Sequence, residues 1–101
     1  MLPIETENKI PFEPEFLLIT FSSASHCIET EKKARQDFNV HIIPTPREIS
    51  ASCGMALRFT GTTPQNVSRF FSGLDVPSQF FAMGSRGEDG KRPAEKLNAR
   101  S

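Results

Sequence analysis

One segment of this sequence combines residue types that could do chemistry. Cys53 and Gly54 follow Ser50 and Ser52 closely, and Arg47 lies a few residues upstream. The thiolate is the reactive form of cysteine, and a nearby cation favours it. Glycine lets a ligand approach the backbone closely, and serine hydroxyls can donate hydrogen bonds to an anion. This combination fits a nucleophilic sulfur or a bound anion, although a lone cysteine that enters a strand is also commonly a small buried hydrophobic residue.

Patterns of apolar residues predict the elements that must position this segment. FLLITF (16–21) is apolar on both faces, as in a central strand, whereas MALRF (55–59) alternates. Thr63, a following proline and an apolar stripe predict a helix that ends at Gly73. The expected elements are a strand at 16–21, a helix at 24–38, strands at 40–43 and 55–59, the helix after Thr63 and a strand at 76–83.

The order of these elements predicts an α+β fold, a ferredoxin-like two-layer sandwich. Its pattern is strand-helix-strand-strand-helix-strand, with a four-stranded antiparallel sheet. Pro77 places the last strand at an edge. We expect a single domain at 16–83, an extended or disordered lead-in at 1–15, and a disordered tail at 84–101 that is rich in glycine, lysine and arginine.

This topology would place the cysteine loop beside the start of the first helix. The first two strands run parallel through a right-handed crossover and the third returns between them, so their ends share one sheet edge. A helix N-terminus offers free N–H groups and about half a positive charge, which favours a thiolate. We therefore expect the thiol pKa of Cys53 to lie below about 8.5. The expected site consists of Cys53 as the reactive residue and Arg47, Glu48, Ser50, Ser52, Gly54, Ser22 and Ser23 as binding residues.

The composition restricts the class of partner. The chain has 101 residues with 12 basic and 12 acidic side chains, and no basic stripe indicates nucleic-acid binding. We expect no signal peptide, because acidic and basic residues interrupt the apolar residues near the N-terminus, and the run at 16–19 is too short to cross a bilayer. We expect a cytoplasmic protein with reduced cysteines, no nucleic-acid or membrane partner, no metal site and no cofactor. Cys27 falls on the apolar face of the first helix, where packing is the expected role.

The motif IPTPREIS (43–50), followed by Ser52, Cys53 and Gly54, resembles a domain-of-unknown-function family labelled "putative selenium/sulfur carrier protein-like". The similarity covers roughly 16–59 and more loosely extends to 83. The resemblance implies that Cys53 is the carrier thiol, with Arg47 and the serines as loop partners. His41 departs from the pattern, because an arginine would be expected before the Ile-Pro motif.

Two functions follow from these patterns. The first is a sulfur or selenium carrier, in which the Cys53 thiolate holds a persulfide-type adduct between a donor and an acceptor protein. The alternative is a non-catalytic protein-interaction or anion-binding module, and it could dimerise through the open sheet face because the strands at 16–21 and 55–59 look apolar on both faces. A carrier or binding protein fits better than a stand-alone enzyme, since no Ser/His/Asp or Cys/His residues have the sequence spacing typical of a catalytic nucleophile and its base.

Overall fold

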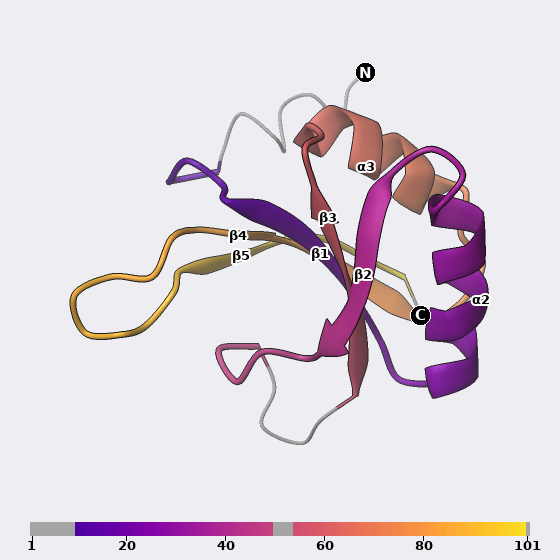
Figure 1. Ribbon diagram of the computed structural model, residues 1–101, viewed down its shortest axis with the longest axis horizontal. Helices are drawn as coiled ribbons and strands as arrows, with labels where there is room; N and C mark the ends of the chain where they lie inside the picture. The colour runs from indigo at the N-terminus through magenta and orange to yellow at the C-terminus, as the bar shows by residue number, and fades with distance from the viewer. Residues whose placement is uncertain (1–9, 50–53, 101) are drawn as a thin grey trace.

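The computed structural model describes residues 10–49 and 54–100. In this part of the chain, five strands form one sheet in the order β2-β3-β1-β4-β5, with neighbours antiparallel throughout. Figure 1 shows both helices on one side of the sheet. The elements are β1 (Phe16–Phe21), α2 (Ala24–Ala34), β2 (Asn39–Pro44), β3 (Met55–Thr60), α3 (Pro64–Ser72), β4 (Ser78–Met83) and β5 (Ala94–Arg100).

The fifth strand shows that the predicted four-stranded ferredoxin-like sheet is wrong. β5 pairs with β4 and lies in the segment expected to be a disordered tail. Its sequence, AEKLNAR, has Leu97 as its one large apolar residue, so the strand depends on its partner and not on a local pattern. Pro77 comes one residue before β4 and takes no place in the ladder. Because β5 pairs with the outer side of β4, β4 lies inside the sheet and not at the edge that Pro77 predicted.

The central strand, β1, lies between β3 and β4 and is buried on both of its faces. Leu17, Ile19 and Phe21 belong to the core between the sheet and the helices. Leu18 points to the opposite face and is also fully buried. Burial on both sides accounts for the continuous apolar run of FLLITF.

Side-chain caps set the start of both helices. The hydroxyl of Ser23 accepts a hydrogen bond from the backbone N–H three residues later at 3.4 Å, and that of Thr63 does the same at 3.2 Å. α2 ends at Ala34, earlier than the apolar pattern predicted. The backbone N–H of Phe38 bonds to the carbonyl of Ala34 at 2.8 Å and turns the chain into β2.

The sheet face opposite the helices carries a second apolar group, which we call the rear cluster. It comprises Leu18, Ala56, Phe81 and Met83, each at most 7 % exposed. Ile49, from the segment after β2, packs against it. The four apolar side chains of the rear cluster are therefore buried, and the described residues leave no open apolar face of the kind expected from the sequence.

Candidate functional site

Three strand ends meet at the sheet edge from which the cysteine segment departs. Met55, the first residue of β3, pairs with Phe21 at the end of β1 and with Pro44 at the end of β2. The backbone N–H of Thr45 donates to the carbonyl of Gly54 at 3.1 Å and extends the β2–β3 ladder by one pair. α2 begins shortly after β1 at this same end of the molecule (Figure 1). This edge therefore brings together Gly54, the segment after β2 and the N-terminus of α2.

Gly54 occupies a position that other residues would fill poorly. Its φ angle is +124°, in the region that favours glycine. A Cβ atom there would lie 3.1 Å from the carbonyl oxygen of Phe21 and 3.4 Å from Oγ1 of Thr45. The missing side chain thus lets the start of β3 pass close to the ends of β1 and β2.

The two predicted serines before α2 have different environments. Ser22 is exposed. Ser23 is the N-cap of α2, and its hydroxyl also lies 3.0 Å from Oγ of Ser25. In the first turn, Nδ1 of His26 is buried and has no hydrogen-bond partner among the described residues. The helix start thus presents an exposed hydroxyl and a buried ring nitrogen at this edge.

The segment after β2 is held to the body of the protein. The backbone N–H of Ile49 donates to the carbonyl of Pro46 at 3.0 Å, which forms a turn, while the Ile49 side chain contacts the rear cluster. Glu48 lies 4.0 Å from the guanidinium of Arg86 in the β4–β5 connection. Arg47 is exposed. Sequence reasoning missed Arg86, because it belongs to the segment expected to be a disordered tail.

The remaining predicted residues, Ser50, Ser52 and Cys53, lie outside the described residues. The structure therefore brings together Gly54, Ser22 and Ser23 and shows the anchoring of Glu48. The chemical role of the predicted site residues stays a prediction.

Cys27 is a contrasting thiol. It is fully buried in the core beneath α2, as its place on the apolar face predicted. Burial raises the pKa of its thiol from 9.0 to about 11, and the negative charge of Glu31 adds to this effect. The thiolate is thus scarcely populated at neutral pH, and Cys27 is unsuited to nucleophilic chemistry.

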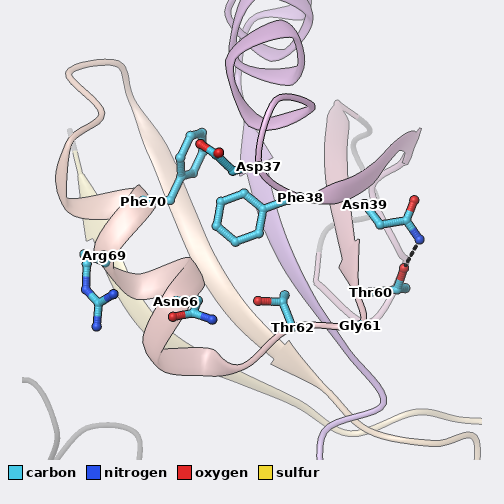
Figure 2. A pocket seen from close by; sticks show the side chains of 9 residues that line it. All are labelled: Asp37, Phe38, Asn39, Thr60, Gly61, Thr62, Asn66, Arg69 and Phe70. Atoms are coloured by element: carbon cyan, nitrogen blue, oxygen red, sulfur yellow. Dashed lines mark hydrogen bonds between the residues drawn. The ribbon is translucent and has the colours of Figure 1, made fainter.

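A separate hollow of about 650 Å³ lies at the other end of β3, about 20 Å from Gly54 along the strand. Figure 2 shows the ring of Phe38 in the middle of its lining, and this ring lies 5.5 Å from that of Phe70. The Asn39 amide donates to Oγ1 of Thr60 at its margin at 2.9 Å. The full lining is Asp37, Phe38, Asn39, Thr60, Gly61, Thr62, Asn66, Arg69 and Phe70. None of the predicted site residues lies here, and no sequence motif marks this hollow.

Within the described ranges, no group of three or more His, Cys, Asp and Glu side chains could hold a metal ion. None of the helices described is both long and apolar enough to cross a membrane.

Comparison with known proteins gives the family of the chain. No curated protein and no solved structure matches it. A family model matches residues 16–78, which run from the first residue of β1 to the first residue of β4 and include the whole loop between β2 and β3. The matched span is more than half of the chain. The chain therefore belongs to the family described as "Putative Se/S carrier protein-like".

Proposed function

We propose that this protein carries sulfur or selenium on the thiol of Cys53 and delivers it to a partner protein. The observation that supports this most directly is the position of Gly54, between the ends of β1 and β2 at the edge where α2 begins. Cys53 is joined to Gly54 by a peptide bond, and consecutive Cα atoms lie about 3.8 Å apart. The family description supports the same function, since it names a selenium or sulfur carrier.

The proposed loading step is the transfer of one sulfane sulfur atom. The Cys53 thiolate attacks the outer sulfur of a donor protein's persulfide and forms a new S–S bond. The donor's own S–S bond breaks, and the donor cysteine leaves as a thiolate. Cys53 is thereby oxidised to a persulfide and the donor cysteine is reduced to a thiol. Delivery is the same exchange onto an acceptor thiol, and selenium would follow the same path with a selenium atom in the outer position.

The surroundings of Gly54 favour an anionic adduct. The N-terminus of α2 contributes unsatisfied N–H groups and about half a positive charge. In the proposal, Arg47 adds a full charge, and the hydroxyls of Ser22, Ser50 and Ser52 add hydrogen-bond donors. Ser23 acts indirectly, since its hydroxyl caps the helix, and Glu48 acts through its contact with Arg86, which helps hold the loop. In a reducing compartment such as the cytoplasm, the thiol would remain available for loading.

The test is intact-mass analysis after incubation with a protein persulfide donor. We expect the wild-type chain to gain the mass of one sulfur atom and Cys53→Ser to gain none. Cys27→Ser is the matched control, because it removes the buried thiol, and we expect it to load as the wild type does. Loading that survives Cys53→Ser, or that is lost only in Cys27→Ser, would refute the assignment.

The pH dependence of alkylation provides a second test in the Cys27→Ser background. If the helix N-terminus and Arg47 favour the thiolate, the rate should reach half its maximum below about pH 8.5, the ordinary pKa of a cysteine thiol. A midpoint at or above that pH would count against the proposed role of α2.

The alternative, an interaction module that dimerises through an open sheet face, loses its structural basis here. Leu18, Ala56, Phe81 and Met83 on that face are almost fully buried within the chain. An anion-binding role for the loop without sulfur transfer would be indicated if Cys53→Ser retained partner binding in full.

A further inference from the structure

The outer edge of β2 offers backbone groups that no other described strand uses. β2 stands at one end of the sheet order and pairs with β3 alone (Figure 1). Thr45 donates to Gly54, so this pair is a hydrogen-bonded one. Because such pairs alternate along an antiparallel ladder, Ile43 and His41 also point their backbone groups toward β3.

It follows that Val40, Ile42 and Pro44 direct their backbone groups away from the sheet. Val40 and Ile42 each offer an N–H and a carbonyl, whereas Pro44 offers a carbonyl only. A proline is tolerated at such an outward position of an edge strand because no ladder donor is lost. The edge thus offers donors and acceptors at Val40 and Ile42, and an acceptor alone at Pro44.

The side chains beside this edge are unusually apolar for a surface. Among the described residues, the exposed large hydrophobic side chains are Ile28, at 42 %, and Ile42, at 37 %. Ile42 shares the helix-facing side of β2 with Val40, which belongs to the core. Ile28 follows the buried Cys27 and lies on the flank of α2 that a right-handed crossover turns toward β2. Both exposed isoleucines therefore border the same unpaired edge.

We propose that β2 pairs with β2 of a second copy of this chain, antiparallel about a two-fold axis at Ile42. Ile42 then exchanges both backbone hydrogen bonds with the partner's Ile42. The N–H of Val40 donates to the carbonyl of the partner's Pro44, and the symmetric bond forms as well. The two sheets become one continuous sheet, as in other isologous interfaces.

The sequence of β2 favours a second copy as the occupant, because this pairing is self-complementary. On the helix-facing side, Ile42 meets the partner's Ile42 and Val40 meets the partner's Pro44, which are all apolar. On the rear side, His41 lies opposite the partner's Ile43. No like charges oppose each other in this register, and exposed isoleucine surface becomes buried at its centre.

The first test is the self-association of the full chain in a Cys53→Ser background, which excludes disulfide formation through the loop. Sedimentation over a concentration series should show a reversible dimer. Ile42→Lys sets two like charges against each other and should weaken the dimer at least tenfold. Asn98→Lys adds the same charge at an exposed position of β5, the opposite edge strand, and should leave the dimer unchanged.

A second measurement protects the test against a variant that fails to fold. In the same background, Ile42→Cys should form an intermolecular disulfide readily, because directly paired Cα atoms lie about 5.5 Å apart. His41→Cys would lie diagonally across the axis from its counterpart and should cross-link less. A chain that stays monomeric at all concentrations, a dimer unaffected by Ile42→Lys, or stronger cross-linking through His41→Cys would each overturn the proposed pairing.

Discussion

The buried thiol of Cys27 should make the stability of this protein depend on pH in the alkaline range. In the unfolded chain this thiol loses its proton near pH 9, whereas in the folded protein its pKa is about 11. Between these values the unfolded state binds fewer protons than the folded state, so the free energy of unfolding falls as pH rises. The stabilising contribution is fully present below pH 9 and is lost as pH rises toward and through 11.

The size of the effect follows from the separation of the two pKa values. Each pKa unit corresponds to about 1.4 kcal/mol, so the full loss is about 3 kcal/mol above pH 11. At pH 10.5 the expected loss is about 2 kcal/mol, because the folded thiol is by then partly ionised. Such a loss is a sizeable fraction of the free energy of unfolding of a native protein, which is typically about 5–15 kcal/mol.

The assay is urea denaturation near pH 7.5 and near pH 10.5, in a Cys53→Ser background so that a single thiol titrates. The comparison variant also carries Cys27→Ala. Lysine and other titrations are common to both proteins, so the difference in their pH dependence isolates Cys27. Cys27→Ala should be less stable near neutral pH, because it leaves a cavity, but should lose about 2 kcal/mol less on going to pH 10.5. Parallel losses in the two proteins would refute the conclusion that burial controls this thiol.

Three further substitutions test the parts of the fold that support the site. Gly54→Ala should cost about 1–3 kcal/mol, because φ is +124° and the new Cβ would lie 3.1 Å from the Phe21 carbonyl; urea denaturation measures this, and a change within 0.5 kcal/mol, about the scatter of surface substitutions, would contradict it. Leu97→Ala should destabilise the protein by roughly 1–2 kcal/mol, because Leu97 packs on the core; an unchanged melting temperature would mean that β5 adds little. Thr63→Ala should cost about 1 kcal/mol by removing the cap of α3, and Thr63→Ser should restore most of it in the same melting experiment.

The elements that sequence reasoning located well are those with a strong local signal. The continuous apolar run at 16–21 is buried on both faces in β1, and Thr63 with its following proline starts α3 where the pattern placed it. Each signal arises within a few neighbouring residues. Local patterns of this kind are readable without knowledge of the partners.

The parts that could not be predicted depend on contacts between distant segments. β5 has a weak strand pattern of its own and exists through pairing with β4. The rear cluster is covered in part by Ile49, a loop residue whose packing no periodicity indicates. The contact between Arg86 and Glu48 likewise joins two loops that are far apart in the sequence, and no local pattern indicates it. The sequence could nominate Glu48 as a site residue, but its partner required the tertiary structure.

The proposed carrier site and the proposed dimer edge are joined by β2 but are separable in their effects. β2 leads from the unpaired edge at Ile42 to Pro44, and Thr45 then anchors the loop through Gly54. In an antiparallel pair of β2 strands, the two strands run in opposite directions. The two loops therefore leave the paired strands at opposite ends, on either side of the two-fold axis. Each loop then keeps its own start of α2 and meets no residue of the other copy's loop. Loss of dimerisation in Ile42→Lys and loss of sulfur loading in Cys53→Ser are therefore independent outcomes, and either proposal can fail while the other stands.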